Sequence, residues 1–337
     1  MKTIMELGMT GNEKYRRQQK EKTEPIWLQS NAKERKRIHL AGLGDVGRNV
    51  ALGLTILGGE EVEHIGLYDL NEAQCKRMEI ELSQVAPPPG GRRIPSVSAL
   101  AWEDIFSCEV FLFCATKSVP ALGSEGKDVR MAQYEANRKI VALYAREAAR
   151  VGYRGLFVVV SDPVDLLCME AFLTSGKETD GKPLATDQIR GCGLGVMHAR
   201  AAYYARKHPE FSLYLEEGRA FGPHGQELVI ANSMDPEHYD DACSKKLTEL
   251  TVGANMQVRA LGFKPFLAPA MSSAVLSIVA LIRGEWHYSA AYLNGLYFGS
   301  LNRQTPEGVE REQSLIPDLL FARLEKAFDS LKEIVWK

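Results

Sequence analysis

The sequence predicts an α/β protein: a doubly wound parallel sheet, followed by an α+β region. Short, almost continuously apolar runs alternate with helical stretches in the first half, which is the pattern of buried parallel strands covered by helices on both faces. After about residue 190, longer helical stretches mix with short strand-like pieces. The pattern therefore divides the 337 residues into an N-terminal arm (1–37), a sheet domain (38–190) and a second domain (191–337).

Four strands are expected in the sheet domain, at 38–42, 62–69, 110–115 and 155–161. The first strand runs into a helix that begins near Asp45, and Asn71 is a suitable N-cap for the helix after the second strand. A polar loop and a long helix near 129–151 separate the third strand from the fourth, which Pro163 stops.

Helices and strand-like pieces are mixed in the second domain, beyond a polar insertion at 174–187. The helices are expected near 197–208, 238–261 and 270–283, and the strand-like pieces near 219–231 and 286–299. The longest uncharged run, 265–282, contains two prolines and several serines and is marginal in length for a membrane span. We expect a buried helix there, reached through a proline-rich loop.

The composition is that of a globular protein, with 45% apolar and 25% charged residues, and it excludes a disordered or collagen-like chain. The net charge is −2, so no global basic field exists to recruit nucleic acid or an anionic membrane, and neither is expected as a partner. The six cysteines form no CxxC pair and none has a histidine at metal spacing, which predicts no metal site and a reduced, cytoplasmic protein.

Charge is concentrated in residues 12–37, which hold nine Lys or Arg and four Glu, a local charge of +5. A solvated arm or helix is the expected structure of this segment. The alternative is an arm that embraces a neighbouring subunit.

A glycine-rich turn joins the first strand to its helix. Residues 42–47 read GLGDVG, the spacing GxGxxG, and the second strand that follows ends in an acidic residue. In this context Gly42 permits the tight turn, Gly44 lets the backbone approach a pyrophosphate, and Gly47 lets helix and strand pack closely. The segment therefore predicts a Rossmann-type dinucleotide site.

The start of the helix and the end of the second strand complete this predicted site. Asp45 and Val46 open the helix, whose N-terminal amide groups and dipole favour phosphate groups. The carboxylate of Asp69 can accept hydrogen bonds from the adenosine ribose hydroxyls and would repel a 2′-phosphate. We therefore expect NAD as the cofactor, in preference to NADP.

Four further motifs follow along the chain: Arg130 seven residues before Asn137, the SDPVD of 161–165, the GCG…AR of 191–200 and the GPHG of 222–225. Together with the glycine turn and Asp69, they resemble the L-lactate/malate dehydrogenase family in order and approximate spacing, over about residues 38–335. Each motif is unspecific alone, but the ordered set is typical of this family.

The resemblance implies an NAD-dependent dehydrogenase that acts on a CH–OH group and moves a hydride between nicotinamide and the α-carbon of a small 2-hydroxy or 2-oxo acid. It implies that His224 is the acid/base. It implies that Arg130 binds and polarises the substrate carbonyl, and that Arg200 holds the small carboxylate substrate by a two-pronged pair.

The resemblance also places Ala115, Asn137 and Ser161 beside the cofactor. Together with the charged arm, it suggests a homo-oligomer, a dimer or a tetramer.

Two residues depart from the family pattern. Met197 stands three residues before Arg200, where the family has an aspartate bonded to the catalytic imidazole, and methionine can neither fix the imidazole tautomer nor stabilise imidazolium. Asp162 stands where the family has an asparagine that touches the reacting oxygen. Asp162 can pair with His224 in place of the lost carboxylate, or face a cationic substrate group such as an amine or imine, or be a turn residue without a role.

The residues that distinguish substrates in this family differ as well. The loop from Ala115 to Arg130 is longer than in the family and lacks the Gln or Arg that separates lactate from malate. Lys264 falls near a small specificity residue, where its charge can accept a second acidic group of the substrate. The sequence thus predicts an oxidoreductase for a small 2-hydroxy acid other than ordinary lactate or malate. The alternatives are a reductase of an imine or amino-substituted acid and a catalytically silent NAD-binding homologue.

Overall fold

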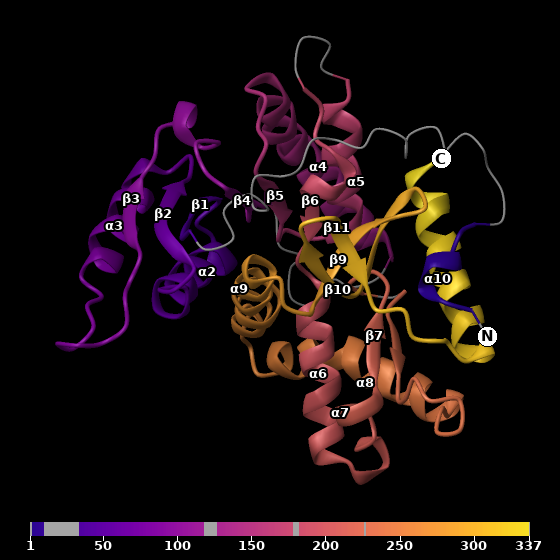
Figure 1. The fold of residues 1–337 in the computed structure, drawn as a ribbon. Coiled ribbons are helices and arrows are strands. Elements are labelled where there is room, and N and C mark those ends of the chain that lie inside the picture. Colours follow the sequence, from indigo (N-terminus) through magenta and orange to yellow (C-terminus); the bar gives the residue numbers. More distant parts are fainter. Residues whose placement is uncertain (1, 10–33, 118–126, 178–181, 226, 337) are drawn as a thin grey trace.

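The computed structural model describes residues 2–9, 34–117, 127–177, 182–225 and 227–336 and, for 127–130, only the backbone. Within these ranges the predicted α/β fold is confirmed: nine strands form one mixed sheet in the order β11-β10-β9-β6-β5-β4-β1-β2-β3 (Figure 1). The strands are β1 (Lys36–Ala41), β2 (Val62–Tyr68), β3 (Ser96–Ala99), β4 (Val110–Phe113), β5 (Leu156–Val159), β6 (Ile189–Gly191), β9 (His287–Leu293), β10 (Leu296–Thr305) and β11 (Gly308–Arg311).

The parallel half of the sheet reverses its strand order at β1. This strand pairs with β2 on one side, where Ile38 lies opposite Ile65, and with β4 on the other, where Ile38 lies opposite Val110. In open parallel sheets, the carboxyl ends of the strands at such a reversal form a crevice in which ligands bind. The glycine turn follows β1 directly and Ala115 follows β4, so both lie at this crevice.

Helices cover both faces of the parallel half (Figure 1). One face packs against α2, α3, the π-helix η7 and α9, and the other face packs against α4 and α5. The helices are η1 (Ile4–Glu6), α2 (Asp45–Leu57), α3 (Glu72–Ser83), η4 (Trp102–Asp104), α4 (Lys127–Arg150), α5 (Val164–Ser175), η5 (Thr186–Gln188), η7 (Pro269–Val275) and α9 (Leu276–Arg283). Asn71 is the N-cap of α3, since its Oδ1 accepts a hydrogen bond from the N–H of Gln74 at 3.2 Å.

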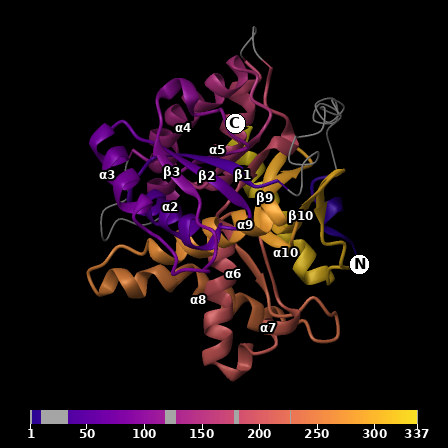
Figure 2. The same ribbon diagram turned by 60° about the vertical axis from the view of Figure 1, so that its left-hand side comes forward.

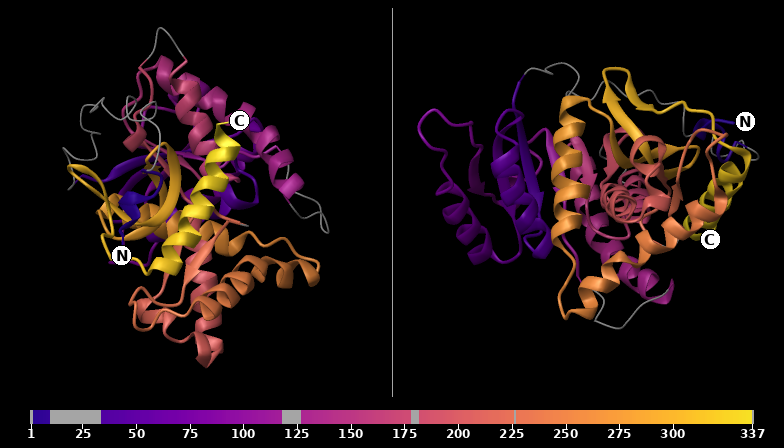
Figure 3. Two further views of the ribbon diagram at one scale, coloured as in Figure 1. Left: turned by 90° about the vertical axis from the view of Figure 1, so that its right-hand side faces the viewer. Right: turned by 90° about the horizontal axis from the view of Figure 1, so that it is seen from below.

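The second domain continues the same sheet. Antiparallel β9, β10 and β11 join it where Gly191 of β6 lies opposite Ala290 of β9. Helices α6, α7 and α8 lie below the sheet in Figure 2, and α10 runs across the domain in Figure 3. These elements are α6 (Leu194–Lys207), η6 (Pro209–Phe211), α7 (Tyr214–Glu217), β7 (Arg219–Phe221), β8 (Val229–Ala231), α8 (Asp241–Ala260) and α10 (Asp318–Val335).

The apolar run 265–282 forms η7 and α9, which agrees with the buried helix expected there. It packs closely on α2, because a Cβ atom added at Gly53 would lie only 2.6 Å from Cγ2 of Val275. In the part of the chain that the structure describes, no helix is both long enough and apolar enough to cross a membrane.

Residues 2–9 pack on the second domain beside α10 (Figure 1). Lys2 forms an antiparallel bridge to the segment that precedes α10, and the side chains of Ile4 and Leu7 are buried in the apolar cluster of that helix. The start of the predicted arm therefore belongs to the second domain of its own chain. Most of the charged part of the arm, 10–33, lies outside the described residues.

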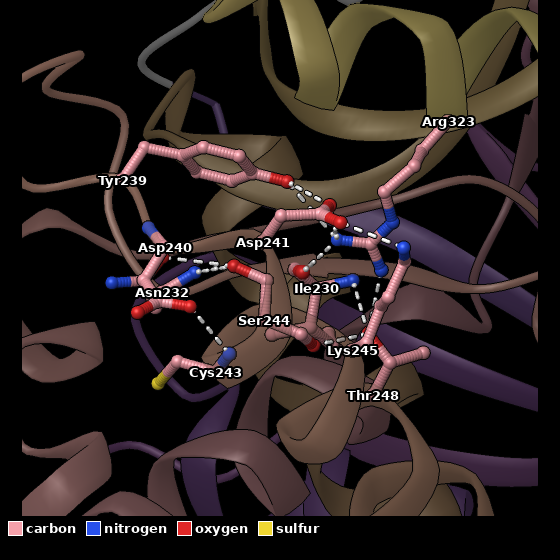
Figure 4. Close-up of polar contacts among 10 residues, drawn as sticks. All are labelled: Ile230, Asn232, Tyr239, Asp240, Asp241, Cys243, Ser244, Lys245, Thr248 and Arg323. Carbon is pink, nitrogen blue, oxygen red and sulfur yellow. Dashed lines mark hydrogen bonds and ion pairs between the residues drawn. The ribbon is translucent and has the colours of Figure 1, made fainter.

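A polar network ties β8 to α8 and α10 (Figure 4). Arg323 of α10 donates to the carbonyl of Ile230 at 3.3 Å and to Oγ1 of Thr248 at 3.1 Å. The N–H of Asn232 donates to Oγ of Ser244 at 2.9 Å, and this hydroxyl donates back to Oδ1 of Asn232 at 2.8 Å. These contacts pair backbone groups at the edge of β8 and so hold this strand against α8 and α10.

Candidate active site

The glycine turn between β1 and α2 leaves room for a phosphate group. Gly42 has a φ of +99°, and a Cβ atom there would lie 2.5 Å from Cα of Ala115. A Cβ atom at Gly47 would lie 1.9 Å from the carbonyl oxygen of Gly42. At Gly44, by contrast, no described atom lies within 4 Å of such a Cβ. Two of the glycines thus allow close packing of the backbone, whereas Gly44 faces open space at the N-terminus of α2.

Asp69 lies at the end of β2, with its carboxylate turned toward the glycine turn. Its Oδ2 accepts the N–H of Leu43 at 2.6 Å, and its Oδ1 accepts the N–H of Asn71 at 3.0 Å. The next residue, Leu70, is 90% exposed. Leu70 is absent from the sequence-based site, although an apolar residue between an acidic strand end and a helix N-cap was a signal that could have found it.

Asn137 of α4 joins the ends of β4 and β5. Its side chain is fully buried, with Nδ2 donating to the backbone carbonyl of Asp162 at 2.8 Å and Oδ1 accepting the N–H of Lys117 at 2.9 Å. Ser161 is only 7% exposed, and its hydroxyl has no hydrogen-bond partner among the residues described. A buried hydroxyl left unpaired at the carboxyl end of a parallel strand fits a site that a polar ligand group completes.

His224 and Asp162 meet at the same edge of the sheet, although 62 residues separate them in sequence. Nδ1 of His224 lies 2.8 Å from Oδ1 of Asp162. The histidine comes from the loop between β7 and β8, and the aspartate comes from the turn after β5. A carboxylate beside Nδ1 makes that nitrogen the N–H donor and leaves Nε2 as the atom available for proton transfer.

Helix α6 brings Arg200 to this edge. The side chain is half-buried, and burial lowers the pKa of its guanidinium, while the nearby carboxylate of Asp162 acts to raise it. Nη1 of Arg200 lies 3.5 Å from Sδ of Met197, which is itself buried. The carboxylate that the family has at this point of α6 is therefore replaced by a thioether, and a carboxylate contacts His224 from a different element. This contact favours the pairing role of Asp162 over contact with a cationic substrate group.

The structure does not test the substrate contacts predicted for Arg130 and Lys264. Arg130 lies in the first turn of α4, but its side chain and the preceding loop 118–126 lie outside the described residues. Lys264 lies in the loop between α8 and η7, with Nζ 3.3 Å from Oδ2 of Asp45. Asp45 and Val46 are the first residues of α2, so Lys264 lies at the end of the crevice that holds the glycine turn. Its predicted contact with the substrate stays a prediction.

Another histidine of α6, His198, has a different environment from His224. Its Nδ1 lies 2.9 Å from the hydroxyl of Tyr214, and its ring stacks on Tyr288 with 4.5 Å between centroids. Burial lowers the pKa of His198 to about 4. A neutral, enclosed imidazole is a poor proton donor at neutral pH, which leaves His224 as the histidine of this site. Within the described ranges, no three His, Cys, Asp or Glu side chains gather as metal ligands.

Curated relatives of the chain are L-lactate dehydrogenases, whereas no family model matches it. L-lactate dehydrogenase 1 of Bacillus cereus is 25% identical over 196 residues, which cover 58% of this chain and only 57% of that protein. L-lactate dehydrogenase 2 of Bacillus cereus is 24% identical over 286 residues, which cover 76% of this chain and 85% of that protein.

Solved structures share the fold. The minor L-lactate dehydrogenase from Enterococcus mundtii has a TM-score of 0.70 at 19% identity, covering 89% of this chain and 98% of its own. The malate dehydrogenase from Aeropyrum pernix has a TM-score of 0.71 at 18% identity, covering 88% and 97%. The chain is thus similar in sequence to L-lactate dehydrogenases and shares the fold of lactate and malate dehydrogenases.

Proposed function

We propose that the protein is an NAD-dependent oxidoreductase that transfers a hydride between bound nicotinamide and the α-carbon of a small 2-hydroxy or 2-oxo acid. The observation that carries the proposal is the contact of His224 with Asp162 at the sheet edge that also holds the glycine turn and Arg200. An imidazole, its carboxylate partner and a guanidinium are the groups that proton transfer and anion binding require. The likeness to L-lactate dehydrogenases supports the same reaction class.

Each polar residue has a distinct part in this proposal. NAD supplies the hydride acceptor or donor. Nε2 of His224 gives a proton to the carbonyl oxygen during reduction and takes it back during oxidation. Asp162 holds Nδ1–H and stabilises the imidazolium, and Asn137 holds the backbone of Asp162 in place. Arg200 binds the substrate carboxylate, and Arg130 polarises the carbonyl.

The crevice fits the dinucleotide. The open backbone at Gly44 and the N-terminus of α2 would hold the phosphates, and Asp69 would accept the ribose hydroxyls. The exposed side chain of Leu70 offers an apolar surface to the adenine ring, and the unpaired hydroxyl of Ser161 offers a polar contact. Ala115, which lies against Gly42, closes the turn from the side of β4.

A panel of 2-oxo acids, with NADH oxidation as the readout, tests the reaction. We expect turnover on at least one acid other than pyruvate and oxaloacetate, without an added amine, and loss of turnover in His224→Gln. Turnover that needs ammonium or an amine would support the imine reductase instead. NADH binding without turnover on any acid would support the silent homologue.

The cofactor preference gives a separate prediction. NADH is expected to bind about tenfold or more tightly than NADPH, because the carboxylate of Asp69 repels a 2′-phosphate. Asp69→Asn keeps one acceptor oxygen for the neighbouring N–H groups and removes the charge, so it is expected to reduce the ratio of NADH to NADPH affinity. Titration of both nucleotides against both proteins measures the effect. Equal affinities in the parent protein would contradict the prediction.

We further propose that two copies of the chain associate through the face formed by α2, α9 and the loop before η7. Large apolar side chains are exposed there: Leu52, Ile56, Leu57, Leu261, Phe263, Leu267 and Leu276. Exposed apolar residues gathered in this way are typical of an interface between subunits.

A single charge placed in this face is expected to separate the copies. Light scattering should give the mass of a dimer or tetramer for the parent and of a smaller species for Ile56→Asp, because a buried, unpaired carboxylate is costly. Leu319→Asp, at another exposed apolar residue, on α10, is the control and should leave the mass unchanged. A monomeric parent protein would refute the proposal.

All six cysteines are free thiols, and five of them are buried. This supports a reducing compartment, and we propose a cytoplasmic protein.

A further inference from the structure

Two cations lie over the first turn of α2. Asp45, the first residue of this helix, engages both: its Oδ1 lies 2.8 Å from Nη2 of Arg48, and its Oδ2 lies 3.3 Å from Nζ of Lys264. Arg48 comes from the next turn of the same helix, whereas Lys264 comes from the second domain, 219 residues further along the chain. A helix N-terminus stabilises a carboxylate and a phosphate alike, so Asp45 provides negative charge where the cofactor would bring more.

Lys264 is free to exchange partners. Its side chain is 64% exposed, and an exposed ion pair of this kind contributes little to stability. The ammonium group sits on a flexible stem with three donors, which adapts to a new acceptor more readily than a guanidinium fork does.

We propose that Lys264 is a ligand of the cofactor pyrophosphate, and that the protein without cofactor keeps this lysine paired with Asp45. The inference rests on the proposed NAD site, and it assigns Lys264 to the cofactor in place of the substrate contact that the sequence suggested. A pyrophosphate carries two negative charges against the single charge of Asp45, so binding transfers the ammonium group to the phosphates. The second domain thereby contributes a residue to the cofactor site.

Binding measurements with NADH, ADP and adenosine test the role directly. Lys264→Met is expected to weaken the binding of NADH and ADP about tenfold and to leave adenosine, which has no phosphate, unchanged. Asp45→Asn is expected to tighten NADH and ADP binding severalfold, because it removes both the competing partner of Lys264 and a charge that repels the phosphates. Lys246→Met is the matched control, since Lys246 is 63% exposed and lies 3.6 Å from Glu210, away from α2.

The two substitutions are expected to change nucleotide affinity in opposite directions, and this distinguishes a phosphate ligand from a residue with a structural role. Either substitution breaks the same ion pair, so a contact that merely stabilises the crevice predicts weaker binding in both variants. That result, or equal NADH affinity in the parent and Lys264→Met, overturns the proposal. If the parent binds neither NADH nor ADP, the proposed NAD site itself is wrong, and the inference is overturned with it.

Discussion

Replacement of Asp162 by asparagine is expected to lower kcat for 2-oxo acid reduction by about two to four orders of magnitude. The amide has nearly the shape of the carboxylate, but its NH2 group can donate to Nδ1 of His224 and so favour the wrong tautomer. It also lacks the charge that stabilises imidazolium. Steady-state kinetics and NADH titration measure the effect, and NADH affinity should stay within about twofold because the substitution leaves the backbone contact with Asn137 in place.

A second substitution distinguishes a catalytic role of Asp162 from a structural one. Met197→Asp restores a carboxylate at the point where the family has one, behind the imidazole. In the Asp162→Asn background it is expected to recover about tenfold or more of the lost kcat, whereas in the parent it should change little. A double variant no faster than Asp162→Asn, or an Asp162→Asn protein with full activity, would show that the contact between Asp162 and His224 does not serve the reaction.

Substitution of Arg200 by lysine is expected to lower kcat/KM for the 2-oxo acid by about one to two orders of magnitude. Lysine keeps the charge but cannot form the two parallel hydrogen bonds of a guanidinium with a carboxylate. The loss should appear mainly in KM, and NADH affinity should be unaffected. Arg206→Lys, an exposed site on the same helix, is the control and should behave as the parent does. Unchanged KM in Arg200→Lys would mean that the substrate carboxylate is bound elsewhere.

The parts of the fold that could be predicted are those with a strong local signal. The apolar runs of β1, β2, β4 and β5 and the cap at Asn71 are visible in a few neighbouring residues. The strands β3 and β6 are short, and β3 alternates serine with small apolar residues, so neither forms an apolar run. The joining of both domains into one sheet depends on Gly191 lying opposite Ala290, about a hundred residues away, and no local pattern encodes such a pairing.

The candidate site also has parts that the sequence could predict and parts that it could not. The roles of the glycines at 42, 44 and 47 follow from backbone sterics that the spacing already expresses. The sequence could name the possible partners of Asp162 but could not choose among them, because the choice depends on the direction of one side chain at the end of β5. Likewise, the contact of Lys264 with Asp45 brings together residues from two domains, which only the packing of η7 on α2 makes possible.

The burial of residues 2–9 beside α10 has a consequence for how the protein is made. Ile4 and Leu7 leave the ribosome long before α10 does, yet their apolar surroundings are completed by this helix, which begins at Asp318. At ordinary rates of synthesis, the roughly 300 residues between them take about 15–60 s, during which these side chains remain exposed to solvent or to chaperones. Closure of the second domain therefore waits for the synthesis of α10, and it joins two segments that are about 300 residues apart in the chain.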